Sequence, residues 1–257
     1  SPTAIVGPPL APPSLQHLFG TDYLGRDVLS RVVWGARPEL VAAALSTALA
    51  AVVGVPLGMV AGARRRLVGG VVMRSMDVLL AFPGILLALV VVTVAGSGLE
   101  TIVIAVALSL APVFARLAYA QTMSLMQRGF VMAARVVGSS EVRTLRRQVL
   151  PNLVGDVLVS ATSMVGWAIL IAASLNFLGF GVQPPGADWG ADLSTAVQYL
   201  NTAWWTATFP GLAIAVTILA VNAFGDSLAE WLDPRTEQSR GMRLVDIEVE
   251  RGVALSG

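Results

Sequence analysis

The stretch VMAARVVGSSEVRTLRRQVLP (residues 131–151) stands between two long apolar runs and resembles neither of them. It contains four arginines, a Gly-Ser-Ser break and a closing proline. A glycine directly after a helical pattern favours a helix end, and a serine favours the start of the next helix. The stretch therefore predicts two short helices joined by a turn, set between two membrane-spanning segments.

Both predicted helices are amphipathic, and the turn between them has suitable chemistry. Gly138 occupies the place where a positive φ is favoured, Ser139 can cap the second helix, and Glu141 lies near that helix's positive N-terminus. Pro151 ends the helical pattern or opens the next span. The apolar faces are formed by Phe130, Ala133 or Ala134, and Val137 in the first helix, and by Val142, Leu145 and Val149 in the second.

The composition of the whole chain indicates that lipid is its solvent. Of the 257 residues, 55% are hydrophobic and 13% are charged, and the mean hydropathy is +0.74. Soluble domains contain about 25% charged residues. The sequence therefore predicts an all-α membrane protein.

The residue types that are missing exclude most catalytic chemistry. The chain has no cysteine, its only histidine is His17, and all of its 17 basic residues are arginine. A phosphate-binding P-loop and a Schiff base both need a lysine. One histidine without neighbouring ligands supports neither a metal site nor a catalytic triad. We expect no catalytic site, no metal and no cofactor bound by this chain.

Five segments are apolar and long enough to cross a hydrocarbon core, which takes about 20 residues. They define a transmembrane domain over 39–232, preceded by a segment over 1–38 and followed by a tail over 233–257. The predicted spans are 39–62, 77–96, 101–121, 154–175 and 206–227.

The uneven distribution of arginine over the loops predicts the orientation. The loop after the first span, the stretch 116–147 and the tail are rich in arginine, whereas the connections 97–100 and 176–205 have none. We therefore expect the hairpin 128–152 and the C-terminal tail in the cytoplasm, and the loop 176–205 outside it. An odd number of spans then places segment 1–38 outside, so we expect a sixth, N-terminal span before Ser1 in the native chain.

The N-terminal segment contains one predicted helix of its own. Thr21 and Asp22 are suitable caps, and an apolar stripe follows them. This pattern predicts a short amphipathic helix on the outer surface, and a helix packed against the bundle is the alternative. The stripe consists of Val28, Leu29, Val32 and Val33, with Trp34 beside it.

A stripe of small residues predicts where helices approach closely. Gly54, Gly58 and Gly62 recur every four residues on one face of the first span. Small residues at this spacing let helices pack tightly in lipid. We expect these glycines to serve helix packing rather than to contact a ligand.

Four polar residues lie at or near predicted span ends. Ionisable groups inside a membrane are costly and often mark a transport pathway. All four can also reach an interface, where that cost does not arise, so both interpretations stay open. They are Asp156, Asn176, Asn222 and Asp226.

The 131–151 stretch has two interpretations from its residues alone. One is a basic juxtamembrane loop held near anionic lipid. The other is a docking surface for another protein. The pair Ala133-Ala134 followed by a turn glycine favours docking, because a loop that faces headgroups has no need of close backbone approach.

The spacing of Ala133-Ala134, Gly138 and Leu150-Pro151 resembles the EAA loop of binding-protein-dependent ABC importer permeases. Nearly the whole chain is similar to the second, C-type permease subunit of the dipeptide/oligopeptide/nickel importer family, which normally has one more N-terminal helix. The matching stretches are GTDYLGRDVLSRVVWGAR (20–37), MDVLLAFPGILLAL (76–89), SLNFLGFGVQPPGADWG (174–190) and FPGLAIAVTILAVNAFGDSL (209–228).

The resemblance implies a type I ABC importer transmembrane domain in the bacterial inner membrane and a role in peptide import. The implied partners are a homologous second permease subunit in a heterodimer, two ATPase domains or a fused ATPase that bind ATP and Mg, an extracytoplasmic substrate-binding protein and membrane lipid, with no nucleic acid. The hairpin would couple the ATPase to transport. The coupling residues carried over are Met132, Ala133, Ala134, Arg135, Gly138, Ser139, Arg143 and Pro151.

The chain departs from the family pattern at two places, and several functions remain open. Met132 stands where the family has glutamate, which removes a polar contact to the ATPase, and Gln148 stands where relatives often have histidine. Nickel, glutathione or haem is an alternative cargo that no residue discriminates. A non-transporting membrane scaffold is an alternative of another class. An intramembrane enzyme is disfavoured because His17 lies outside the spans.

Overall fold

The first long helix begins at an aspartate cap. In the computed structural model, Asp27 accepts a hydrogen bond from the Ser30 N–H at 2.8 Å, and α1 (Val28–Ala63) follows without a break. The predicted short surface helix is therefore wrong as a separate element, because its residues are the first turns of α1. Thr21 and Asp22 lie in the preceding loop rather than at the cap. Pro38 does not end the helix, since the turns before it are held by contacts with a distant loop, described below.

The structure describes residues 1–64 and 67–232, and the predicted tail over 233–257 lies outside them. Within the described ranges the regular structure is helical, with two isolated antiparallel bridges in the N-terminal segment. After α1 follow α2 (Leu67–Leu80), α3 (Gly84–Ala95), α4 (Leu99–Leu125), α5 (Gly129–Val136), α6 (Glu141–Thr144), a π turn (Leu145–Val149), α7 (Leu150–Phe177), α8 (Trp189–Ala196), a 3-10 turn (Val197–Tyr199) and α9 (Trp205–Leu232).

The second predicted span, 77–96, is wrong as a single helix. The chain bends by 90° between α2 and α3, and α2 begins ten residues before the predicted span. The break falls at Ala81-Phe82-Pro83, where Pro83 supplies no N–H for the preceding helix and becomes the N-cap of α3. The apolar run in the sequence was continuous, so hydropathy alone did not show this break.

The other predicted spans are single helices that extend beyond the predicted bounds. Within the described residues, four helices are long and apolar enough to cross a membrane, or five if the bent α2–α3 pair counts as one span. α4 continues past Arg116, whose side chain pairs with Asp77 at 2.7 Å. α7 and α9 each have 28 residues.

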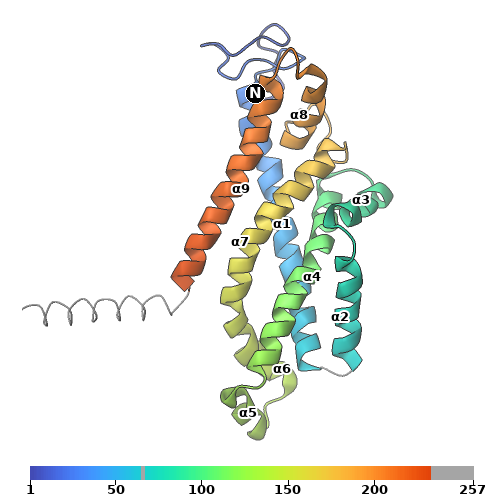
Figure 1. The fold of residues 1–257 in the computed structure, drawn as a ribbon, viewed down its shortest axis with the longest axis vertical. Coiled ribbons are helices and arrows are strands. Elements are labelled where there is room, and N and C mark those ends of the chain that lie inside the picture. The colour runs from blue at the N-terminus through green and yellow to red at the C-terminus, as the bar shows by residue number, and fades with distance from the viewer. Residues whose placement is uncertain (65–66, 233–257) are drawn as a thin grey trace, which may run out of the picture.

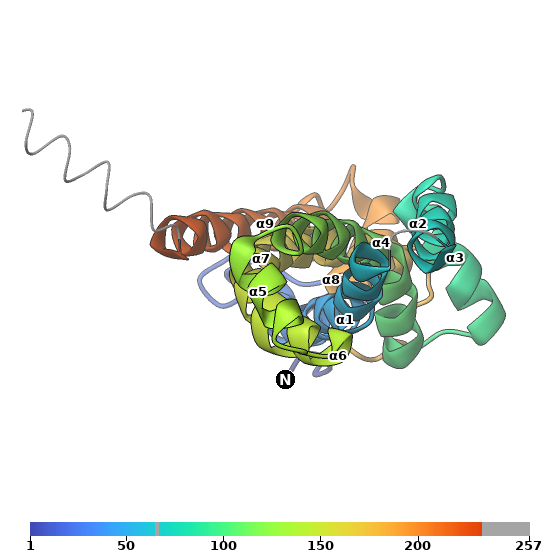
Figure 2. The ribbon, with the colours of Figure 1, turned by 90° about the horizontal axis from the view of Figure 1, so that it is seen from below.

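The core of the bundle lies between α1 and α4, and α7 packs across both (Figure 1). Buried alanines and β-branched residues dominate this core, with Phe114 as the largest side chain with no exposed surface. Seen from below, α9 and α3 lie at opposite edges (Figure 2). The α5–α6 hairpin lies at one end of the bundle, and α8 lies with the N-terminal segment at the other (Figure 1). The two candidate sites are therefore at opposite ends of the same helices.

Candidate functional site

The turn after α5 is built by Gly138. Its φ is +88°, a conformation that side chains with a Cβ rarely adopt. The Ser139 N–H donates to the Ala134 carbonyl at 3.0 Å, and the Gly138 N–H donates to the Arg135 carbonyl at 3.0 Å. These two bonds form a Schellman motif, which satisfies the last carbonyls of α5. A Cβ built on Gly138 would meet nothing within 4 Å, so backbone conformation rather than space requires glycine here.

The second half of the hairpin differs from the prediction. The N-cap of α6 is Ser140, whose Oγ accepts from the Arg143 N–H at 3.4 Å, while the Ser139 hydroxyl bonds to Thr144 at 3.2 Å. No separate second helix forms, because α6 runs through the π turn directly into α7. Pro151 therefore opens the next span instead of ending the pattern, and it lies directly after the π turn at the start of α7.

The hairpin is attached to the bundle by a small buried face. Val131 and Val149 are completely buried, and Leu145 is nearly so. Glu141 also pairs with Arg64 at the end of α1, with 2.8 Å between the carboxylate and the guanidinium. Both side chains are partly solvent-exposed, so this pair contributes little free energy by itself. The buried valines are the main attachment.

The remaining apolar residues of the hairpin point away from the bundle. Val136 and Val137 are each 88% exposed, and Met132 is 53% exposed. Of the two predicted apolar faces, Phe130, Val137 and Val142 are exposed, whereas Leu145 and Val149 are buried together with Val131. Among the predicted coupling residues, Ala134 and Ser139 are half-buried. The others, Met132, Ala133, Arg135, Gly138, Arg143 and Pro151, are exposed.

The three glycines of α1 lie against α4. A Cβ on Gly54 would come within 2.4 Å of the Ala111 carbonyl oxygen, and one on Gly58 within 2.2 Å of the Ala115 carbonyl oxygen. A Cβ on Gly62 would approach the Thr122 side chain at 2.8 Å. Because the first two obstacles are backbone atoms, a larger residue there requires the helices to move apart. The glycines set the distance between the two central helices.

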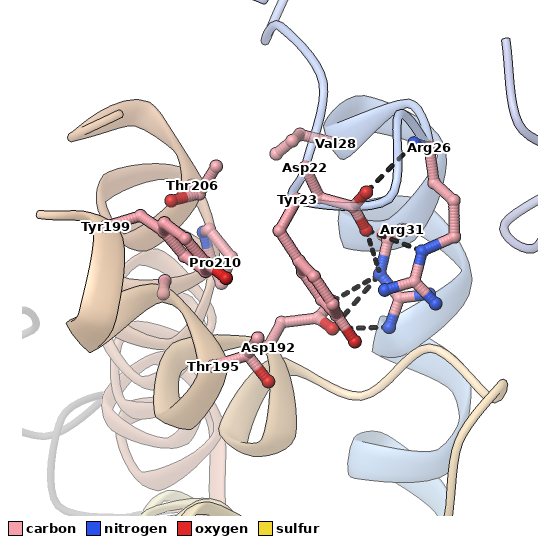
Figure 3. Close-up of a pocket in the computed structure, with 11 residues that line it drawn as sticks. Asp22, Tyr23, Arg26, Val28, Arg31, Asp192, Thr195, Tyr199, Thr206 and Pro210 are labelled. Carbon is pink, nitrogen blue, oxygen red and sulfur yellow. Dashed lines mark hydrogen bonds and ion pairs between the residues drawn. The ribbon is translucent and has the colours of Figure 1, made fainter. Parts of the chain in front are cut away.

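At the opposite end, Arg31 joins the N-terminal segment to the loop before α8 (Figure 3). Its guanidinium donates to both carboxylate oxygens of Asp192 and to the carbonyls of Pro2 and Gly186, the latter two at 3.1 and 3.0 Å. The Trp189 indole also donates to the Val32 carbonyl at 2.7 Å. These contacts hold the first turns of α1 in place.

Positively and negatively charged side chains alternate around Arg31. Asp22 accepts from the Arg26 Nε at 2.6 Å and lies 3.8 Å from Arg31 (Figure 3). The pocket between these residues and Tyr199 has a volume of about 20 Å³, which suits a water molecule rather than a solute. Burial raises the pKa of Asp192, while the Arg31 guanidinium lowers it. The arrangement is a fixed ion-pair network.

Sequence reasoning missed a second polar cluster below this network. The Asn176 amide donates to the Asp188 carboxylate at 2.7 Å and to Glu39 at 3.2 Å, and all three residues are buried. Burial raises the pKa of Asp188 to about 6, although the Ala191 N–H lowers it. In the sequence Glu39 marks only the edge of a span, and 137 residues separate it from Asn176. No local pattern indicates that contact.

Comparison with known proteins identifies the family to which this chain belongs. Residues 54–238 match the model of the family described as binding-protein-dependent transport system inner membrane component. The chain belongs to this family. The predicted ABC importer permease and its helical fold class are thereby confirmed, and the protein is a multi-pass inner membrane protein.

Individual members of the permease family are similar over most of their length. The chain is 41% identical to the di/tripeptide transport system permease protein DppC of Pseudomonas aeruginosa, over 90% of this chain and 78% of that protein. It is 46% identical to the glutathione transport system permease protein GsiD of Escherichia coli, over 87% of this chain and 74% of that protein. Both figures agree with a C-type permease of the peptide/nickel group.

A solved structure supports the fold. A chain of the inward-facing MetNI methionine ABC transporter superposes with a TM-score of 0.65, covering 80% of this permease and 97% of that chain. Its sequence identity of 17% limits the comparison to the fold. As a permease of a binding-protein-dependent importer, the protein works with an ATPase and a substrate-binding protein.

Proposed function

We propose that this permease forms half of the translocation pathway of an importer of short peptides and couples to its ATPase through the hairpin 128–152. The observation that carries the proposal is the hairpin itself, in which a glycine-dependent turn presents exposed apolar and arginine side chains at one end of the bundle. Exposed apolar residues on a fixed turn are typical of a protein interface. The arginine-rich loops support a cytoplasmic location for this end and for the C-terminus.

The continuous helix behind the hairpin supplies the mechanical connection. Because α6, the π turn and α7 form one uninterrupted run over Glu141–Phe177, displacement of the hairpin moves α7 as a rigid element. At its far end α7 contributes Asn176 to the buried polar cluster with Glu39 and Asp188. Closure of the ATPase on binding ATP would thus rock α7 against α1, which fits alternating access by rigid-body motion.

Met132 suggests how the hairpin is held without the family's glutamate. Met132, Val136 and Val137 are all exposed, so their contact with the ATPase is apolar. Methionine adapts its shape to irregular apolar grooves. We therefore infer that these three side chains provide most of the binding free energy between hairpin and ATPase, and that the nearby arginines orient the hairpin. ATP and Mg bind on the ATPase chains, and a homologous permease completes a heterodimer.

Replacing the hairpin arginines tests the docking surface. Arg143, Arg146 and Arg147 are exposed and outside the buried face. If they contact the ATPase, their triple substitution by glutamine weakens co-purification of the ATPase, whereas Arg74→Gln, an exposed arginine on α2, leaves it unchanged. Equal recovery of ATPase with both variants would mean that these arginines face only lipid headgroups or water.

The cargo is proposed from the relatives, which are named for di/tripeptides and for glutathione. Peptides are the main proposal, and glutathione, itself a tripeptide, is the second candidate because of the higher identity to its permease. A strain lacking the gene, complemented with the wild-type chain, should recover uptake of a labelled dipeptide. If the strain recovers uptake of glutathione, nickel or haem but not of the dipeptide, that compound is the cargo instead of peptides. If it recovers uptake of none of them, the result favours a scaffold without a transport role.

A further inference from the structure

A cavity of about 450 Å³ lies between α7 and α9, and nothing described so far accounts for it. It lies half-way along α7, in the part of the helix predicted to cross the membrane. Its volume is in the range of sites for small molecules. Its lining combines polar and apolar side chains, namely Ser163, Trp167, Leu170, Ile218, Asn222 and Asp226.

Two glycines bring the helices together around this cavity. A Cβ on Gly225 would come within 2.3 Å of the Thr162 hydroxyl, so α9 approaches α7 closely at that point. A Cβ on Gly166 would lie 3.2 Å from the Asn222 side-chain oxygen. The absence of a side chain at Gly166 therefore gives Asn222 its place against α7. Close packing of the two helices therefore positions Asn222 beside the cavity.

All charged residues of the two helices that line the cavity, α7 and α9, are acidic. Neither α7 nor α9 contains an arginine or lysine, while α9 contributes Asp226 and Glu230 and α7 contributes Asp156. Asp156 accepts a hydrogen bond from Gln121 at 2.7 Å. Asp226 is exposed to the cavity, and the ion pairs between described residues do not include it. An ionisable residue on a lipid-crossing helix is costly unless it faces water or a partner.

We propose that this cavity binds a primary ammonium group on the molecule in transit, such as the free amino terminus of a short peptide. The Asp226 carboxylate supplies the charge, and the Asn222 and Ser163 side-chain oxygens accept the remaining N–H groups. The Trp167 indole, which is 56% exposed, attracts a cation to its face. The identity of the cargo rests on the proposed function, whereas the preference for a cation rests on the cavity.

Charged thiol reagents test the preference for a cation without any transport. Because the chain has no cysteine, Ser163→Cys gives a single reactive position on this subunit. In membranes containing the assembled importer, we expect aminoethyl methanethiosulfonate to modify it about tenfold faster than sulfonatoethyl methanethiosulfonate, after correction for their rates with free thiol. Adding Asp226→Asn should bring the ratio close to one. Adding Glu100→Gln instead should leave the ratio of the two rates unchanged, because Glu100 is an exposed charge in the first turn of α4.

Two results would overturn the proposal. A ratio near one in the Ser163→Cys importer would mean that Asp226 is already neutralised, for example by an arginine of the second permease. No reaction with either reagent would mean that lipid or protein fills the cavity.

Uptake of dialanine by the reconstituted importer tests whether the ammonium group bound in the cavity belongs to a transported peptide. Asp226→Asn should lower the maximal rate about tenfold and Asp226→Glu should restore most of it, with the half-saturating concentration, set by the binding protein, unchanged. An Asp226→Asn importer that equals the Glu100→Gln control overturns the ammonium site. If the wild-type importer transports no dialanine but the tenfold difference between the two thiol reagents is observed, the proposal of a peptide cargo is wrong and the cation site is supported.

Discussion

The distance between single atoms decides how closely α1 can approach α4. A Cβ at Gly58 would lie 2.2 Å from the Ala115 carbonyl oxygen, which cannot rotate away. We expect Gly58→Ala to lower the free energy of unfolding by about 1–3 kcal/mol, the usual cost of overpacking. Thermal unfolding of the purified importer measures this. The matched control is Gly70→Ala on α2, where a Cβ meets nothing within 4 Å, and an equal effect of both changes would refute the packing role.

Asp188 makes stability depend on pH. Its pKa rises from 3.8 to about 6 in the folded protein, mainly because the carboxyl group is buried. The folded state therefore binds more protons than the unfolded state between these values. Protonation of Asp188 therefore stabilises the folded state by up to about 3 kcal/mol. This stabilisation is fully present below pH 3.8 and is lost as the pH rises through about 6.

Replacing Asp188 isolates this contribution. Unfolding midpoints of wild type and Asp188→Asn should differ in their slope between pH 4 and pH 6, with the wild type losing stability more steeply as pH rises. Parallel curves would show that Asp188 does not titrate in this window.

Which residues could be predicted depended on how local their role is. Gly138 and the glycine stripe were found from the sequence, because a turn glycine and a four-residue repeat are visible within one helix. The cap was misplaced by one residue, since Ser139 and Ser140 have the same chemistry and only the geometry of the turn separates them. The Glu39–Asn176–Asp188 cluster is a tertiary contact that no such pattern contains.

At the scale of elements, hydropathy predicted five apolar segments, of which four are single long helices in the described residues and one is a bent pair of helices. The run 78–96 contains no charged residue, yet Pro83 divides it into two helices at 90°. The hairpin shows the opposite case, since the sequence predicted two short helices and the second merges with α7 through a π turn. Length and apolarity do not distinguish one helix from two in series.

Arg31 is expected to hold the N-terminal segment on the bundle. Its side chain is 5% exposed and pairs with Asp192, and breaking a buried pair typically costs about 3–5 kcal/mol. Phe19 stacks on Phe209 at 3.8 Å, so chymotrypsin can report release of this segment. Cleavage at Phe19 and Tyr23 should be faster in Arg31→Ala than in wild type. It should be unchanged in Arg37→Ala, an exposed arginine of the same helix, and equal rates in both variants would contradict the clamp.

At the scale of the whole molecule, the hairpin and the outer polar network occupy opposite ends of one helical bundle. α1 and α7 connect these ends, with Arg64 and Arg31 at the two ends of α1 and Asn176 at the far end of α7. The assignment of these ends to the two sides of the membrane stays a prediction from charge bias, and the family match agrees with a permease. The α7–α9 cavity needed the structure, because in the sequence Asn222 and Asp226 are also explained by a position at the membrane interface.

The coupling ratio of the reconstituted importer tests the central claim most directly. Gly138→Val strains a turn at φ +88°, by about 1–2 kcal/mol, whereas Gly138→Asn is tolerated there far better. A Cβ at this position meets nothing within 4 Å, so both variants should assemble. We predict that Gly138→Val hydrolyses ATP while importing several-fold less dipeptide per ATP than wild type, and that Gly138→Asn stays close to wild type. Unchanged transport per ATP in an assembled Gly138→Val importer would contradict coupling through this hairpin.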